Sequence, residues 1–232
     1  KKNLETRLDD CAEILIDCEN EDLNFENAAP SDAVLDLKAL FENDNPLVLE
    51  IGCGKGGFAC EFAKRNPNVN VIAVEKVGNV IVAACEAAKQ AGLQNIRFMK
   101  CNAEYLPCYI PAGSVTTLYL NFSCPFPKKK YAKHRLTHPN FLKIYKQLLA
   151  PGAPICQKTD NMHFFEFSLE SFSQCGFRLS NISLDLHASD FPTWACRFTG
   201  LKQGLIKSFA DANKTNISAL RFSERAFFVD KI

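Results

Sequence analysis

The sequence has no apolar run near the length of a membrane-spanning helix. A helix that crosses a bilayer needs about 18–20 consecutive apolar residues, and none of that length occurs among the 232 residues. The first ten residues, KKNLETRLDD, also lack the apolar stretch of a secretory signal peptide. We therefore expect a cytoplasmic protein that has no membrane partner.

Cysteine pairs with the spacing of a zinc site are absent, although cysteine itself is abundant. The chain has 11 cysteines, and no two of them stand in a CxxC pattern. An odd number cannot be fully paired, and Cys53, Cys60, Cys85 and Cys101 lie among apolar or small residues. We predict mostly buried free thiols, as is typical of a reducing compartment, and no metal site.

The chain as a whole lacks an excess of charge of either sign. It has 27 Lys and Arg residues against 26 Asp and Glu residues, so no overall field attracts nucleic acid. One segment without acidic residues is strongly basic, with Lys128, Lys129, Lys130, Lys133 and Arg135. Out of context, such a run is most often a solvated surface, so its meaning depends on what lies beside it.

Short apolar runs alternate with helical patterns from residue 46 onward. Buried strands are predicted at Leu47–Ile51, Val69–Val74, Ile96–Met99, Val115–Leu120 and Ala153–Lys158. Helical spacing occurs at Gly57–Arg65, Val77–Ala91, Pro139–Leu149 and Asn161–Gln174. The alternation predicts an α/β, Rossmann-like, doubly wound fold, with a mostly parallel sheet and helices on both faces. Arg221–Val229 predicts a last strand, antiparallel at the edge of the sheet.

The first 45 residues do not share this alternation. Leu8, Ala12, Leu15 and Ile16 have the spacing of a short amphipathic helix, and the acidic stretch Glu19–Asp32 predicts a loop. We therefore divide the chain into a helical and loop extension, residues 1–45, and one domain, residues 46–232.

Glycines and acids follow the strands of the domain where a ligand would bind. Sheets of this kind bind ligands beyond the carboxyl ends of their strands. Gly52 and Gly54 follow the first strand and allow the backbone to approach a ligand closely. Glu75 follows the second strand, where an acid can accept hydrogen bonds from ribose hydroxyls. The pattern fits a dinucleotide and S-adenosylmethionine almost equally, and it also fits a tight turn with no ligand.

Two details favour S-adenosylmethionine. A charged Glu50 is costly inside a buried strand unless it meets a cation, such as the amino group of this ligand. Asn102-Ala103, after the third strand, offers an amide for the edge of an adenine. A nicotinamide-binding protein would also need a second substrate domain, for which the residues after Asp190 leave little room.

The fourth strand runs into the segment NFSCPFPKKKYAKHRLTHPNF, residues 121–141. Two prolines stiffen the chain where a substrate would meet the methyl donor. The basic run follows at once and includes Tyr131, a combination that suits phosphate contacts beside a stacked base. The segment therefore favours an RNA substrate.

This segment resembles the signature of the bacterial tRNA (guanine-N7)-methyltransferases, Asn-Phe-(Pro/Ser)-Asp-Pro-Trp-Pro-Lys followed by basic residues. LEIGCGKGGF, AVEK, CNAE, KTDN and LDLHASDF are also typical of that family, and the resemblance covers roughly residues 46–192. It implies methyl transfer from S-adenosylmethionine to N7 of a guanine in the variable loop of tRNA, by a monomer or homodimer.

Carried over position by position, the resemblance implies two sets of site residues. For S-adenosylmethionine the resemblance implies Glu50, Glu75 and Asn102, and the residue pattern after the strands adds Gly52, Gly54 and Ala103. The residues expected to bind tRNA are Lys128, Lys129, Lys130, Lys133, Arg135 and Asp160 and, by a looser alignment, Cys196, Arg197, Phe198 and Thr199.

The chain departs from the family pattern at three positions. Cys124 stands where the family has its catalytic aspartate, Phe126 replaces a tryptophan, and Thr199 replaces a glutamate. Guanine N7 carries a lone pair and no proton, so the reaction needs no base, but a carboxylate would offset the charge developing on the purine. Losing such a group costs roughly 10²–10³ in rate. We expect a methyltransferase that is either active or attenuated; the alternative is a non-catalytic homologue that binds tRNA and S-adenosylmethionine.

Overall fold

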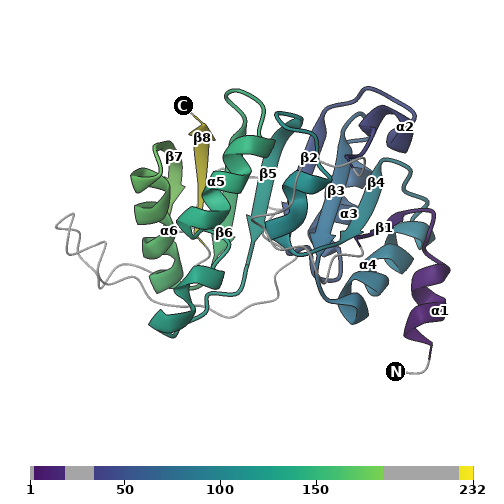
Figure 1. Cartoon of the computed structure of the whole chain (residues 1–232), viewed down its shortest axis with the longest axis horizontal. Helices are drawn as coiled ribbons and strands as arrows, with labels where there is room; N and C mark the ends of the chain where they lie inside the picture. The colour runs from purple at the N-terminus through teal and green to yellow at the C-terminus, as the bar shows by residue number, and fades with distance from the viewer. Residues whose placement is uncertain (1–2, 19–33, 185–224, 232) are drawn as a thin grey trace. The chain divides into compact units, whose positions relative to one another are not determined.

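The computed structural model describes residues 3–18, 34–184 and 225–231 (Figure 1). The chain forms two compact units. Unit 1 comprises Lys1–Tyr119 and Ile144–Ala153, and unit 2 comprises Leu120–Lys143 and Pro154–Ile232. Among the described helices, none combines the length and the apolar character that a membrane crossing requires.

A parallel sheet forms the centre of unit 1. All four pairs of neighbouring strands run parallel. Their order is β1 (Leu15–Asp17), β4 (Ile96–Lys100), β3 (Asn70–Glu75), β2 (Leu47–Ile51) and β5 (Val115–Asn121). All five residues of β2 are buried, as expected for a strand covered on both faces.

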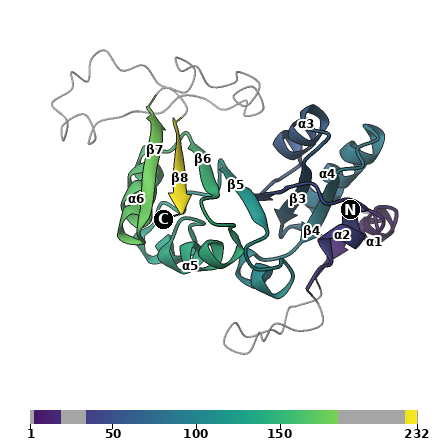
Figure 2. The same cartoon turned by 90° about the horizontal axis from the view of Figure 1, so that it is seen from above.

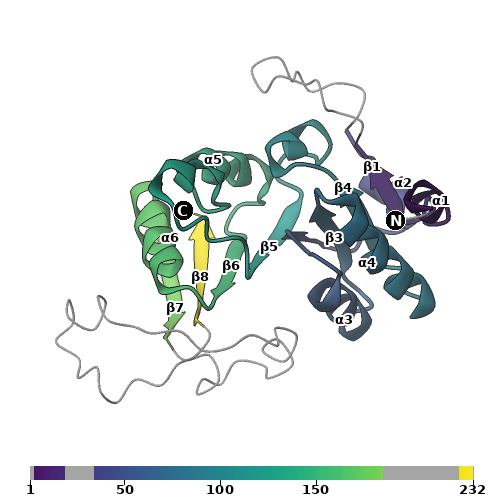
Figure 3. The same cartoon turned by 90° about the horizontal axis from the view of Figure 1, so that it is seen from below.

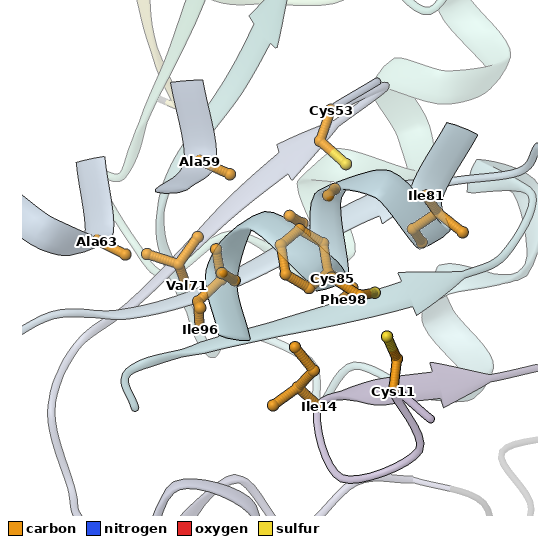
Figure 4. Close-up of a cluster of buried hydrophobic side chains, with 13 residues drawn as sticks. Cys11, Ile14, Cys53, Ala59, Ala63, Val71, Ile81, Cys85, Ile96 and Phe98 are labelled. Atoms are coloured by element: carbon orange, nitrogen blue, oxygen red, sulfur yellow. The ribbon is translucent and has the colours of Figure 1, made fainter. Parts of the chain in front are cut away.

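Helices lie on both faces of this sheet (Figure 2). α3 (Gly57–Arg65) and α4 (Gly78–Gln90) share one face, where their small side chains pack with β3 and β4 in a buried cluster (Figure 4). α2 (Leu37–Phe41) lies on the other face, where Arg97 of β4 donates a hydrogen bond to the carbonyl of Leu40. Unit 1 also contains α1 (Leu4–Asp9) and a 3₁₀ helix, η2 (Ala103–Cys108).

Unit 2 contains a smaller group of strands in mixed directions. β8 (Arg225–Lys231) lies between β6 (Pro154–Thr159) and β7 (Phe177–Ser183) and runs antiparallel to both (Figure 3). α6 (Met162–Gln174) packs on β6 and β7, and the basic run forms a 3₁₀ helix, η3 (Lys129–His134). α5 (Pro139–Leu148) begins in unit 2 and ends in unit 1.

The fold class is confirmed, and the five predicted strands and four predicted helices are all present. The predicted last strand exists and is antiparallel, but it lies one place in from the edge, because β7 pairs along its outer side. β7 was not predicted. The division into residues 1–45 and 46–232 stays a prediction.

The predicted N-terminal helix is wrong in its extent. α1 ends at Asp9, and Leu15 and Ile16 belong to β1, which pairs with the open edge of β4. Between them, Cys11 and Ile14 are buried in the cluster of Figure 4. Tertiary pairing therefore overrides the helical spacing of these residues. The predicted loop Glu19–Asp32 lies outside the described residues.

The prediction of free thiols is confirmed for the ten cysteines in the described ranges. Cys53, Cys85 and Cys101 are buried, and Cys60 is partly buried. These side chains fill small spaces between helices and strands, as small hydrophobic residues do.

Candidate functional site

The turn after β2 contains three glycines in a backbone conformation that other residues rarely adopt. Gly52, Gly54 and Gly56 have φ angles of 81°, 57° and 76°. A Cβ added to Gly54 would meet no atom within 4 Å, whereas one added to Gly56 would lie 2.7 Å from the Cβ of Ala84. Gly54 thus faces open space in which a ligand can approach the backbone, and Gly56 allows α3 to pack closely on α4.

Glu75 joins the end of β3 to this turn. Its Oε2 accepts a hydrogen bond of 3.2 Å from the N–H of Gly54, and its Oε1 accepts one of 3.0 Å from the N–H of Val77. A carboxylate has about four acceptor positions, so two remain for the hydroxyls of a ligand. The structure thus brings together Gly54 and Glu75, two of the residues predicted to bind the cofactor.

Glu50 is an acid inside the central strand of unit 1. Its exposed fraction is 2%, and it lies in register between Ala73 and Tyr119 of the neighbouring strands. Burial, reinforced by the negative charge of Glu50, raises the pKa of the Cys60 thiol to about 11 and that of Cys53 well above its usual range. The start of the glycine turn is therefore a place where a cationic ligand group would be stabilised.

The segment after β4 completes this edge of the sheet. The N–H of Cys101 donates to the carbonyl of Glu75 at 3.3 Å, which places the segment next to the end of β3. Asn102 is exposed and its side chain does not cap η2, whereas Ala103 is buried. Asn102 is therefore available to a ligand that lies across the ends of β3 and β4.

The segment after β5 has a strained backbone on both sides of Cys124. Phe122 has a φ of 51° and Phe126 a φ of 41°, values uncommon outside glycine. The N–H of Phe122 donates to the carbonyl of Lys158 in β6 at 2.9 Å, and the side chain of Cys124 is exposed. Strain of this kind concentrates at functional sites, where neighbouring structure must maintain it. We define residues 122–127 as the Cys124 loop.

Four of the predicted tRNA-binding residues form an exposed basic surface on and next to η3. Tyr131 stands among them with 41% of its side chain exposed, and the Nζ of Lys130 lies 5.0 Å from the centre of its ring. The four residues are Lys128, Lys129, Lys130 and Lys133. In the described part of the chain, none of these lysines forms an ion pair with an acid. Free positive charge beside an exposed aromatic ring suits a nucleic-acid backbone with an unstacked base.

Arg135 differs from these lysines because it points inward. Its exposed fraction is 9%, and burial lowers the pKa of its guanidinium. Its Nε donates to the carbonyl of Pro125 at 2.9 Å and its Nη2 to that of Phe126 at 3.1 Å. The structure therefore groups Arg135 with the Cys124 loop, and the tRNA contact predicted for it stays a prediction.

Asp160 lies directly after β6 and is partly buried. The next residue, Asn161, caps α6 by accepting a hydrogen bond of 2.9 Å from the N–H of Phe164. Asp160 thus lies at the carboxyl end of a strand, and the tRNA contact predicted for it stays a prediction. The remaining predicted substrate residues, Cys196, Arg197, Phe198 and Thr199, lie outside the described residues.

Sequence reasoning missed a buried polar network that fixes the far end of the basic run. The Oγ1 of Thr137 lies 2.8 Å from the Oγ of Ser168 in α6, and the Nε2 of Gln157 in β6 donates to the same Oγ at 3.0 Å. A serine in the middle of a helix was the one available signal, but its partners are distant in sequence. Across the described ranges, no cluster of three side chains is suited to a metal ion.

Comparison with known proteins gives sequence relatives along most of the chain. A family model described as "Putative methyltransferase" matches residues 44–195. A protein of Geobacillus sp. (strain WCH70) named tRNA (guanine-N(7)-)-methyltransferase is 47% identical over 152 residues, 66% of this chain and 69% of that protein. A Bacillus subtilis (strain 168) protein of the same name is 42% identical over 172 residues, 74% of this chain and 80% of that protein.

Solved structures resemble the chain in fold. The 16S rRNA methyltransferase KamB has a TM-score of 0.56 and 21% identity, covering 86% of this chain and 93% of that chain. A geranyl diphosphate C-methyltransferase from Streptomyces coelicolor A3(2), in complex with S-adenosyl-L-homocysteine, has a TM-score of 0.54 and 18% identity, covering 81% of this chain and 74% of that chain. At these identities the likeness concerns the fold alone.

Proposed function

Because the chain belongs to the tRNA (guanine-N7)-methyltransferase family, we propose that it transfers a methyl group from S-adenosylmethionine to N7 of a guanine in tRNA. The observation that carries the proposal is the hydrogen bond between Glu75 and the open glycine turn at Gly54, in a chain 42–47% identical to proteins of that name. The proposal includes a cytoplasmic location, where tRNA is available, and the guanine of the variable loop as the target. A monomer or homodimer remains the expected assembly.

The residues of unit 1 fit S-adenosylmethionine. The backbone at Gly54 is open to a ligand, and Glu75 keeps acceptor positions for two ribose hydroxyls. Glu50 supplies a buried negative charge for an amino group, and Asn102 an exposed amide for an adenine edge. When bound, this cofactor supplies an electrophilic methyl group on a positively charged sulfur.

For this reaction the protein must align guanine N7 with the methyl group and compensate the positive charge that develops on the purine. It does not need to supply a base. The lone pair of guanine N7 forms the new bond to the methyl carbon while the carbon–sulfur bond breaks, so no proton leaves N7. The work of unit 2 is to hold the tRNA, which the exposed lysines on and next to η3 support through phosphate contacts, with Tyr131 as a stacking surface. Asp160, at the end of β6, is proposed to contact the same substrate.

Cys124 is proposed to make this enzyme slower than one with the family aspartate. A neutral thiol compensates poorly for positive charge on the purine, so Cys124→Asp should raise kcat by up to roughly 10²–10³. The measurement is transfer of labelled methyl from S-adenosylmethionine to unmodified tRNA transcripts, followed by mapping of the modified base. Cys124→Asn serves as the matched control, because it adds a polar group of similar shape without the charge and should give little gain.

The alternative, a non-catalytic binding protein, predicts a different outcome of the same experiment. If the chain is a binding protein, neither the parent nor the Cys124→Asp variant transfers labelled methyl to tRNA, while both still bind tRNA. Label on a base other than guanine, or at a position other than N7, would instead overturn the proposed target while leaving the chain an enzyme.

A further inference from the structure

The inward turn of Arg135 is at odds with a role in binding the tRNA backbone. Its neighbours Lys133 and His134 are exposed, whereas Arg135 has 9% of its surface accessible. All its described side-chain hydrogen bonds go to main-chain carbonyls of the Cys124 loop. Little of this guanidinium is therefore accessible to a phosphate of the tRNA backbone.

The two carbonyls that Arg135 binds belong to the residues directly after Cys124. Pro125 accepts at 2.9 Å from Nε and Phe126 at 3.1 Å from Nη2. Phe126 has a φ of 41°, a conformation that a residue with a side chain leaves unless its surroundings hold it. A guanidinium hydrogen-bonded to both carbonyls keeps Phe126 from relaxing to a more common φ, because charged donors make stronger hydrogen bonds than neutral ones.

The other side of Arg135 is fixed to α6. Its guanidinium carbon lies 4.4 Å from the centre of the Phe167 ring, within the range of a cation–π contact. Two residues on, Thr137 is fully buried and bonded to Ser168 of the same helix. The chain at residues 135–137 is thus attached to α6 at two points, so Arg135 holds the Cys124 loop against a fixed support.

Within the part of the chain that the structure describes, the charge of Arg135 does not balance an acid. In the described ranges it forms no ion pair with a carboxylate, and a buried cation without one is costly. A group that only filled space would be apolar there. The retained charge is accounted for by its two loop carbonyls and the ring of Phe167.

We propose that Arg135 is a positioning residue that holds the loop at Cys124–Phe126 in the conformation in which residue 124 meets the substrate base. The inference rests on the proposed tRNA methylation, but it concerns how the loop is held and does not depend on which base is methylated. It separates Arg135 from the exposed lysines: the lysines bind tRNA, and Arg135 shapes the site.

The test compares Arg135→Met and Arg135→Lys with Lys133→Met, which removes an exposed charge from the same run. Arg135→Met should lower kcat at least tenfold, with KM for tRNA within about threefold of the parent. Arg135→Lys, which keeps the charge and one donor group, should recover part of this loss. Lys133→Met should instead raise KM for tRNA.

The salt dependence of tRNA binding distinguishes the two roles directly. Loss of one phosphate contact lowers the slope of log K against log salt by roughly 0.7–0.9. We expect such a change for Lys133→Met and none for Arg135→Met. A lower slope and a higher KM for Arg135→Met, with kcat preserved, would make Arg135 a phosphate contact and overturn the proposal.

A readout independent of methylation keeps the proposal testable if the parent chain does not methylate tRNA. Cys124 is exposed, so its rate of alkylation by iodoacetamide, followed by peptide mass mapping, reports the state of the loop. Arg135→Met should change this rate at least threefold and Lys133→Met should not, both in protein with the circular dichroism of the parent. Equal alkylation rates in the parent and in Arg135→Met would refute the positioning role of Arg135. If Arg135→Met does not fold, the alkylation rate of Arg135→Lys is compared with that of the parent instead, and equal rates there would refute the role in the same way.

Discussion

The pKa values of single thiols in this chain differ because their surroundings differ. The pKa of Cys18 is lowered, chiefly because the thiol of Cys101 donates a hydrogen bond to it, whereas burial raises the pKa of Cys60 to about 11. Both side chains are partly buried, so access to them is comparable. Their positions in the sequence gave no sign of this difference, since the pairing of β1 with β4 brings Cys18 beside Cys101.

We predict that iodoacetamide at pH 8 alkylates Cys18 at least tenfold faster than Cys60. The thiolate is the reactive form, and a thiol with a pKa about three units above the pH is ionised to only about 0.1%. The rate at Cys60 should rise about tenfold per pH unit up to about pH 11, while that at Cys18 should level off earlier. Peptide mass mapping over time measures both, and parallel pH profiles would contradict the prediction.

The glycines of the turn after β2 allow a matched pair of substitutions. Gly54→Ala meets only the cost of a positive φ, about 1–2 kcal/mol. Gly56→Ala adds a Cβ 2.7 Å from that of Ala84 and should cost at least about 1 kcal/mol more. Urea denaturation measures both. Gly54→Ala should nevertheless lose more affinity for S-adenosylmethionine, and equal losses of stability would show that the packing role assigned to Gly56 is wrong.

Among the elements, α6 depends on one side chain at its start. The Oδ1 of Asn161 accepts from the N–H of Phe164 at 2.9 Å, and the helix also supplies Phe167 and Ser168 to the support of the Cys124 loop. Asn161→Ala should therefore lower the free energy of unfolding by about 1 kcal/mol. Asn161→Asp, which keeps an acceptor, should cost much less. A similar loss in both variants, measured by urea denaturation, would mean that the cap is not the cause.

The elements also show what the sequence could and could not predict. Strands such as Leu47–Ile51 and helices such as Gly57–Arg65 were found because apolar spacing follows local geometry. β1 was missed because Leu15 and Ile16 fit one face of a helix, and only the edge of β4 makes them a strand. β7, Phe177–Ser183, has few large apolar residues and depends on its pairing with β8.

In the candidate site, too, some features could be predicted from the sequence and others could not. Gly54 and Glu75 were both predicted to face a ligand because each follows the carboxyl end of a strand. That β2 and β3 are adjacent, so that the two residues are hydrogen-bonded, is known only from the structure. The inward orientation of Arg135 could not be predicted, because it depends on Phe167, a residue of a different element. Motifs therefore identify which residues gather at the site, and packing decides which of them point outward.

At the scale of the whole molecule, a net charge of +1 makes electrostatic attraction of RNA a local property of one surface. Stability, in contrast, is a property of the whole fold: any ligand that binds the folded state raises the free energy of unfolding of the entire chain. A ligand at 100 times its Kd stabilises by about 2.7 kcal/mol if it does not bind the unfolded chain. For a chain of this length, that corresponds to a rise in Tm of roughly 5–10 °C.

We predict a shift of this size with S-adenosylhomocysteine, measured by scanning calorimetry, and no shift with NAD at the same concentration. Glu75→Gln is the matched variant: its amide keeps the shape of the carboxylate but offers one acceptor oxygen in place of two, so both the bond to Gly54 and the ribose contacts weaken. The shift in this variant should fall to less than half at the same ligand concentration. A larger shift with NAD than with S-adenosylhomocysteine would reassign the glycine turn to a dinucleotide, and an undiminished shift in Glu75→Gln would remove Glu75 from the cofactor site.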